Sequence, residues 1–191
     1  CTVVLGELKN NEVNYKAINS CITFLSTLQG KQLIIVEELI SKDGSLHPVQ
    51  EAMVNYHGSQ CGFCTPGFVM SLFSMFKKYS KFKDDVIKDS IAGNLCRCTG
   101  YQPIIKAAKS LKNKNKIDHF SKNQKRTINL LKKISNKSIA IYRKDKKYFA
   151  PRYVQELKKI LKKNINADFL SGGTDLSLSV TKERKDISSV I

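Results

Sequence analysis

Four of the six cysteines in this 191-residue chain form two tight pairs, and this pattern constrains the fold most. Cys61 and Cys64 flank two residues, Cys96 and Cys98 flank one, and thirty-one residues separate Cys64 from Cys96. No secretion signal is visible, so a disulfide framework is disfavoured. Four thiolates are what a [2Fe–2S] cluster or a structural zinc ion requires. The spacing favours iron and sulfur but leaves zinc open, because zinc sites more often use two C-x2–4-C pairs.

The first part of the chain predicts short strands followed by a helix. Runs of β-prone residues lie at residues 2–5 and 33–36, with a polar turn at residues 9–12. Apolar residues then recur with helical spacing from His47 onward, with Ser45 as a candidate cap and Gly58 as the expected end.

Three further short helices are expected before residue 112. The second starts at Pro66 and has one apolar face, the third covers residues 84–92, and the fourth starts near Pro103. Four short helices with short connections predict a compact bundle around the cysteine pairs.

The remainder of the chain differs in composition and in the pattern of its apolar residues. A lysine- and asparagine-rich stretch has room for one amphipathic helix around residues 128–134. Strands are then expected at residues 139–142 and 167–170, with a helix at residues 153–161 between them. A glycine turn follows the second strand. This order predicts the opening of an α/β or α+β domain.

Positive charge is concentrated in the second half of the chain. Residues 1–105 carry a net charge of +1, and residues 106–191 carry +16 of the total of +17. Nucleic acid or an anionic surface is one explanation. Solvated lysines in a compositionally biased chain are the favoured one, since no clustered aromatic residues or nucleic-acid motif accompanies them.

Local sequence around the two cysteine pairs is distinctive. The strings are GSQCGFCTPGF at residues 58–68 and GNLCRCTGYQPI at residues 93–104. In each, a cysteine is followed by threonine, by glycine or proline, and then by an expected helix, whose N-terminus would face the thiolates. Gly62 and Gly100 are expected to be glycines because the backbone approaches sulfur there.

Together these strings resemble the helical [2Fe–2S] domain of the xanthine oxidase/dehydrogenase family, which aldehyde oxidases and carbon monoxide dehydrogenase small subunits share. The resemblance implies that Cys61, Cys64, Cys96 and Cys98 hold a [2Fe–2S] cluster. It also implies that the amide of Gln60 contacts the pterin of a molybdenum cofactor on a partner chain. No metal role is expected for the histidines, which are His47, His57 and His119.

The resemblance extends to both sides of the cysteine pairs. Cys1 and Cys21 are similar to the third and fourth ligands of the family's ferredoxin-like [2Fe–2S] cluster, and we expect the other two to precede a truncated start. Residues 149–157 and 167–176 resemble the start of the family's flavin domain, where glycines admit a pyrophosphate. The implied FAD-binding residues are Leu170, Ser171, Gly172, Gly173, Thr174 and Asp175.

The expected fold class is α+β, in four parts. Residues 1–42 are the C-terminal part of a ferredoxin-like β-grasp domain, residues 43–112 a four-helix [2Fe–2S] bundle, residues 113–146 a linker, and residues 147–191 the beginning of an α+β FAD-binding domain. No run of apolar residues is long enough to span a membrane, and a cytoplasmic location is expected.

The function implied by this resemblance is electron transfer within an oxidoreductase. Electrons would pass from a molybdenum–molybdopterin centre on a large partner subunit, through [2Fe–2S] clusters, to FAD and NAD, within a higher heteromer. Hydroxylation would occur on the partner chain, so no catalytic residue is expected here. The substrate, with a purine favoured, and the acceptor stay open. The alternatives are a zinc-stabilised basic module that binds nucleic acid and a remnant without cofactors.

Overall fold

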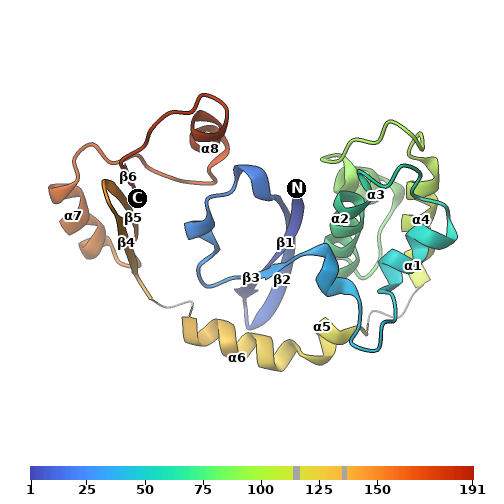
Figure 1. Cartoon of the computed structure of the whole chain (residues 1–191). Helices are drawn as coiled ribbons and strands as arrows, with labels where there is room; N and C mark the ends of the chain where they lie inside the picture. The colour runs from blue at the N-terminus through green and yellow to red at the C-terminus, as the bar shows by residue number, and fades with distance from the viewer. Residues whose placement is uncertain (114–116, 135–136) are drawn as a thin grey trace. The chain divides into compact units, whose positions relative to one another are not determined.

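The computed structural model describes residues 1–113, 117–134 and 137–191, which form two compact units (Figure 1). The first consists of Cys1–Ser20 and Lys31–Leu131, and the second of Cys21–Gly30 and Lys132–Ile191. Each unit combines a three-stranded sheet with helices, which confirms the mixed α and β class expected from the sequence. No helix of the described residues is long and apolar enough to cross a membrane.

The first unit begins with an antiparallel sheet in the order β2-β1-β3. Its strands are β1 (Thr2–Lys9), β2 (Glu12–Asn19) and β3 (Gln32–Ile34). Asn10 and Asn11 both have positive φ, 50° and 63°, as a two-residue turn between twisted strands requires. The expected strands and turn are therefore confirmed, except that β3 stops at Ile34 before the short 3-10 helix η3 (Val36–Leu39).

Four helices follow in the first unit, as the sequence predicted. They are α1 (Pro48–Asn55), α2 (Thr65–Lys78), α3 (Asp84–Ile91) and α4 (Gln102–Ser110), which continues into η4 (Leu111–Asn113). Figure 1 shows them gathered together beside the strands of the same unit. They place the residue 61–64 loop between α1 and α2, and the residue 96–98 loop between α3 and α4.

Helix α2 is the centre of this unit. All nine residues from Phe68 to Phe76 are buried, because α2 packs against β1 and β2 as well as against α1 and α3. The expectation of a single apolar face is therefore wrong. A helix buried on every side needs apolar residues all round, and even Ser71 and Ser74 are buried here.

The ends of α1 differ from the sequence expectation. Its N-cap is His47 and not Ser45: the His47 ring accepts a hydrogen bond from the N–H of Val49, and Gln50 completes the capping box. At the other end the left-handed residue is His57, with φ 52°. Gly58 is needed for space instead, since a Cβ there would lie 2.7 Å from the Met53 sulfur.

Part of the expected linker is packed into the first unit. Residues 117–134 contain α5 (His119–Lys122) and α6 (Gln124–Ile134). Phe120 and Leu131 are buried in the same hydrophobic cluster as α2. The amphipathic helix expected around residues 128–134 is confirmed, and it starts four residues earlier.

The second unit has a sheet in the order β4-β5-β6. The strands are β4 (Ile139–Arg143), β5 (Lys146–Ala150) and β6 (Ser189–Val190), and the helices are α7 (Val154–Lys163) and α8 (Thr174–Thr181). The short 3-10 helix η2 (Leu25–Leu28) also belongs to this unit, and η1 (Ser20–Ile22) spans the boundary. The strand expected at residues 167–170 is wrong, since only Asp168 forms a bridge, to Val190.

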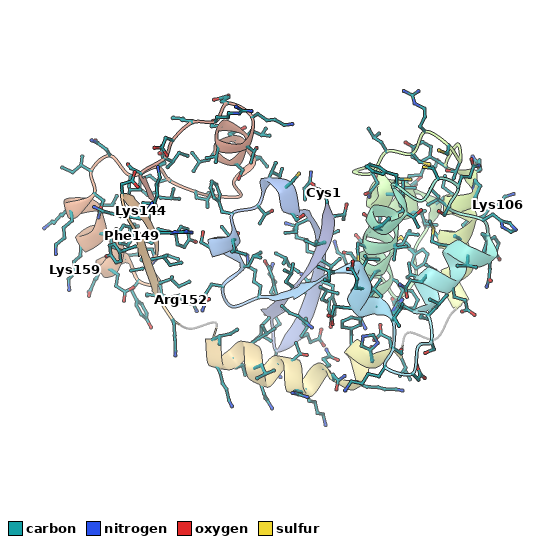
Figure 2. All side chains as sticks on the ribbon, in the orientation of Figure 1. Cys1, Lys106, Lys144, Phe149, Arg152 and Lys159 are labelled. Atoms are coloured by element: carbon teal, nitrogen blue, oxygen red, sulfur yellow. The ribbon has the colours of Figure 1, made fainter. Side chains whose placement is uncertain are left out.

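Lysine side chains give the second unit its basic surface. Lys144 lies at the turn of the β4–β5 hairpin and Lys159 lies on α7, and both side chains are exposed (Figure 2). Phe149 is buried in the same unit, where its ring meets that of Tyr142 edge-on at 5.6 Å. The exposed lysines agree with the interpretation of the charge as solvated surface.

Candidate metal centre

The structure brings the four paired cysteines together. The Sγ atoms of Cys61 and Cys98 are 3.5 Å apart, and Cys64 and Cys96 are close enough for each side chain to shift the pKa of the other. Each of these contacts joins one loop to the other, so the pairs in space are not the pairs in sequence. Segments separated by thirty-one residues thus supply one compact group of thiols.

The two spatial pairs differ in their exposure. Cys64 and Cys96 are partly buried and pack against the hydrophobic core, whereas Cys61 and Cys98 are exposed. The group therefore has an inner pair, Cys64 with Cys96, and an outer pair, Cys61 with Cys98. A bound group would lie between the core of the unit and its surface.

Hydrogen bonds and burial act differently on the thiols. Hydrogen bonds from the Thr99 side chain and backbone lower the pKa of Cys96 to about 7. Burial, followed by the neighbouring Cys96, raises the pKa of Cys64. The backbone N–H of Phe63 and the contact with Cys98 lower the pKa of Cys61, and the contact with Cys61 raises that of Cys98. Cys96 is thus the inner thiol whose anion the surroundings favour most.

Helix N-termini lie beside both loops, as the sequence predicted. Cys64 is the N-cap of α2, and Tyr101, three residues after Cys98, is the N-cap of α4. Gly62 and Gly100 have φ of 84° and 66°, a left-handed backbone that favours glycine. Their expected role of admitting backbone close to sulfur stays a prediction.

Three side chains that hold the residue 96–98 loop were not anticipated. The hydroxyl oxygen of Tyr101 accepts the N–H of Cys96 at 3.0 Å, and the hydroxyl of Thr99 lies 3.1 Å from the Cys96 sulfur. Asn94 donates to Ser71 on α2 at 2.7 Å and accepts from Thr2 at 2.9 Å. Nothing local in the sequence identifies the long-range partners of Asn94.

The donor set fits a two-iron cluster. In a [2Fe–2S] cluster each iron takes two protein ligands, so two thiol pairs are required. The inner and outer pairs meet that requirement with thiols alone. Among the residues that the structure describes, no group of three or more His, Cys, Asp or Glu side chains is arranged to hold a single metal ion.

Several side chains next to the four cysteines in sequence face solvent. Gln60, which precedes Cys61, is exposed. Phe63, which precedes Cys64, and Leu95, which precedes Cys96, are 96% and 85% exposed, although both are large and apolar. Each loop therefore presents one large apolar side chain to solvent.

Cys1 and Cys21 are not brought together within one unit. Cys1 is exposed and its thiol contacts the Asn19 side chain, while its carbonyl accepts the N–H of Ser20 at 2.8 Å. Cys21 is exposed and begins the segment Cys21–Gly30, which belongs to the second unit.

The glycine turn of the second unit precedes α8 directly. Gly172 and Gly173 have φ of 73° and 82°, and Gly173 is the N-cap of α8. A Cβ on Gly173 would lie 3.0 Å from Leu170 and 3.2 Å from Ser177. The Ser177 hydroxyl is buried without a hydrogen-bond partner. Ser171, Gly172, Thr174 and Asp175 are exposed, and Leu170 is half-buried. A left-handed turn with free N–H groups at a helix start suits a phosphate.

A buried charged network supports the N-terminus of α1. Asp118 accepts from the Nε2 of His47 at 3.0 Å and from the Nζ of Lys77 at 2.9 Å. The side chains are 3%, 1% and 8% exposed, respectively. Burial raises the pKa of Asp118, but the hydrogen bonds from His47, Lys77 and Ser121 outweigh it and hold the pKa well below its usual range. His47 is thus fully engaged as a helix cap.

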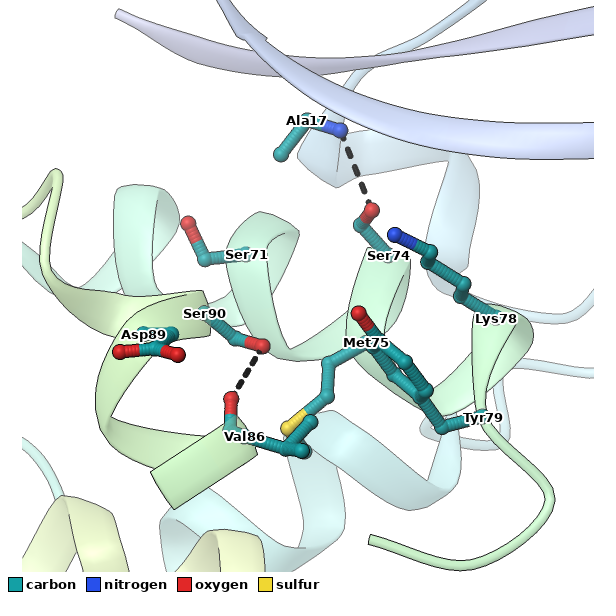
Figure 3. A pocket seen from close by; sticks show the side chains of 9 residues that line it. All are labelled: Ala17, Ser71, Ser74, Met75, Lys78, Tyr79, Val86, Asp89 and Ser90. Carbon is teal, nitrogen blue, oxygen red and sulfur yellow. Dashed lines mark hydrogen bonds between the residues drawn. The ribbon is translucent and has the colours of Figure 1, made fainter.

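A small pocket lies between β2, α2 and α3, separate from the cysteines. It has a volume of about 260 Å³ and is lined by three serines, Ala17, Asp89 and the larger side chains of Met75, Lys78, Tyr79 and Val86 (Figure 3). Ser74 accepts the N–H of Ala17 at 3.1 Å, and Ser90 donates to the carbonyl of Val86 at 2.6 Å. Because Ser71 accepts from Asn94, all three serines are already bonded within the protein.

Comparison with known proteins identifies the middle of the chain. Residues 35–109 match a family model described as a [2Fe-2S] binding domain. The chain is 44% identical over 110 residues to a xanthine dehydrogenase of Oryza sativa subsp. japonica and 49% identical over 111 residues to one of Blastobotrys adeninivorans. It is 41% identical over 112 residues to aldehyde oxidase 1 of Oryctolagus cuniculus.

These similarities cover part of the chain and a small part of each relative. The aligned stretches are 56%, 56% and 58% of this chain, and the chain spans 8% of each of the three relatives. Among solved structures, the aldehyde oxidoreductase from Desulfovibrio gigas is 30% identical with a TM-score of 0.50, covering 59% of this chain and 12% of that one. None of these comparisons supports the zinc-stabilised nucleic-acid-binding alternative.

Proposed function

We propose that this chain is the electron-transfer part of a xanthine-dehydrogenase-like molybdenum hydroxylase. The premise is that residues 35–109 are a [2Fe-2S] binding domain of the kind present in xanthine dehydrogenases and aldehyde oxidases. The observation that carries the proposal is the meeting of two thiol pairs from two distant loops. A purine is the favoured substrate of the whole enzyme, with hydroxylation on a partner chain.

Each spatial pair would hold one iron. Cys64 and Cys96 would bind the iron on the core side, and Cys61 and Cys98 the iron on the solvent side. When bound, the cluster supplies a one-electron carrier. The chain's own contribution is to hold four thiolates at fixed positions, to bury the inner pair, and to donate hydrogen bonds to sulfur.

The exposed part of the two cysteine loops is where a molybdenum-binding partner subunit would dock. Phe63 and Leu95 are large apolar side chains that are almost fully exposed beside the ligands. Exposed apolar groups of this kind mark interaction sites. Gln60 lies on the same loop as Phe63 and is exposed, so its amide could reach the pterin of the partner's cofactor.

The second unit would begin an FAD-binding domain. The left-handed glycines at 172 and 173 and the first turn of α8 form a phosphate cradle, and the unpaired Ser177 hydroxyl lies next to it. Flavin would pass electrons to NAD. Cys1 and Cys21 would be two ligands of a ferredoxin-like cluster. The four-part domain division expected from the sequence stays a prediction, and so does a cytoplasmic location.

Metal analysis tests this proposal directly. The chain is produced anaerobically with iron supply, and iron, zinc and acid-labile sulfide are measured together with visible and EPR spectra. About two iron and two sulfide per chain are expected at the helical site. A colourless protein with about one zinc and no sulfide would contradict the proposal.

A further inference from the structure

Two threonines follow cysteines in the candidate centre, and the structure gives them different partners. Thr65 follows Cys64 and Thr99 follows Cys98, within the repeated local sequence of the two loops. The hydroxyl of Thr65 is hydrogen-bonded to Ser59 at 2.6 Å. The hydroxyl of Thr99 instead lies 3.1 Å from the sulfur of Cys96. The threonine of the same Cys-Thr dipeptide therefore has a different hydrogen-bond partner in each loop.

The direction of the Thr99 hydrogen bond follows from its other contact. The N–H of Tyr101 donates to the Thr99 oxygen at 3.2 Å, which occupies a lone pair of that oxygen. The hydroxyl hydrogen is then available for the Cys96 sulfur, and a thiolate there can only accept. The N–H of Thr99 also points to this sulfur, at 3.4 Å.

Thr99 directs two donors at one sulfur. Its hydroxyl lies 3.1 Å and its N–H 3.4 Å from the sulfur of Cys96. Cys96 belongs to the inner pair, which packs against the hydrophobic core, so both contacts lie on the core side of the site.

We propose that Thr99 is a positioning residue that raises the reduction potential of the cluster by donating its hydroxyl hydrogen to the Cys96 sulfur. Reduction adds one electron and hence one negative charge to the cluster and its thiolates. A hydrogen bond to a sulfur ligand stabilises the more negative, reduced state more than the oxidised state. This inference rests on the proposed function, because it requires a cluster on the four cysteines.

The test is a potentiometric titration of the reconstituted full chain, followed by EPR and visible absorption. Cys1→Ser and Cys21→Ser are included in every sample so that one cluster gives the signal. Thr99→Val should lower the midpoint potential, while Thr99→Ser, which keeps the hydroxyl, should restore it. Thr65→Val is the matched control, and its midpoint should stay at the reference value.

The possible outcomes separate the two proposals. A reference protein without iron and sulfide contradicts the proposed function. A cluster that assembles but has the same midpoint in Thr99→Val, or shifts equally in Thr65→Val or Thr99→Ser, overturns the role of Thr99. If Thr99→Val loses the cluster, Thr99→Ala repeats the measurement with a smaller side chain. Loss of the cluster in both overturns the inference too, since the hydroxyl would then serve assembly.

Discussion

The two cysteine loops supply equal numbers of thiols but are held in place by different means. The residue 61–64 loop is tied to its own flanks: Thr65 donates its N–H to the carbonyl of Gly62 at 3.2 Å, and the hydroxyls of Thr65 and Ser59 are bonded at 2.6 Å where α2 starts. The residue 96–98 loop is held by the side chains of Tyr101, Thr99 and Asn94. The comparison teaches that the first loop is closed by neighbouring residues, whereas the second is also tied, through Asn94, to Ser71 on α2 and Thr2 on β1.

The largest effect should come from removing a ligand from either loop. Cys64→Ser and Cys96→Ser should each abolish the stable cluster, because three thiolates leave one iron incompletely held. Cys1→Ser should retain the iron and sulfide of the helical site. Chemical analysis of iron and sulfide decides the matter. If one of the two loop variants kept a full cluster, the loops would not contribute equally.

The next largest effect should come from breaking the buried charged network that supports α1, the helix before the first loop. Asp118→Ala leaves Lys77 buried without its carboxylate and removes a partner of His47, the cap of α1. A loss of about 3–5 kcal/mol in the free energy of unfolding is expected, as for other broken buried ion pairs. Urea unfolding measures it.

Asp84→Ala is the matched control for that variant. Asp84 pairs with Lys109 at 2.6 Å, but both side chains are 44–48% exposed. Its removal should cost far less than the removal of Asp118, because solvent screens an exposed ion pair. Equal losses in the two variants would show that burial of Asp118 does not matter.

The buried carboxylate of Asp118 should make the free energy of unfolding sensitive to acid. The pKa of Asp118 is depressed in the folded state, so its contribution to stability is present above its ordinary value of about 3.9 and is lost as the pH falls below that. His47, Lys77 and Tyr15 are the titratable groups that face it, and its charge, after burial, helps to raise the pKa of Tyr15 to about 12. The free energy of unfolding should fall between about pH 5 and pH 2.

Asp118→Asn tests this assignment. The variant should be less stable at neutral pH, and the decline of its unfolding free energy in acid should be shallower than that of the reference protein. Identical slopes for both proteins would assign the acid sensitivity to other carboxyl groups.

The smallest effect should come from a single hydroxyl of the second loop. Tyr101→Phe removes the acceptor of the Cys96 N–H and should cost about 1 kcal/mol of unfolding free energy. It should also speed the loss of iron to a chelator, because the loop loses one of its ties. Tyr56→Phe, at a side chain that is 42% exposed, is the control and should change neither quantity. A silent Tyr101→Phe would mean that this hydroxyl does not hold the second loop.

Local patterns were good predictors of elements and poor predictors of their ends. The four helices and the strands β1 and β3 lie close to where spacing and turn residues placed them. The cap of α1 was missed because His47 becomes a cap through its bond to Asp118, seventy-one residues away. The strand expected at residues 167–170 is represented by the bridge of Asp168 with Val190 and by the bond from the N–H of Leu170 to the carbonyl of Ile191. The expectation of one-sided burial of α2 failed because a sheet covers its second face.

The sequence by itself determined which residues carry the candidate chemistry: four thiols at tight spacings, glycines for left-handed turns, and helix starts beside them. These are local properties, set by covalent spacing and by the φ values that each residue tolerates. Only the tertiary structure decided that Cys61 pairs with Cys98 and Cys64 with Cys96, and that Thr99 but not Thr65 faces a sulfur. Those choices depend on how α2 is buried between the sheet and the other helices, and no local spacing encodes such long-range packing.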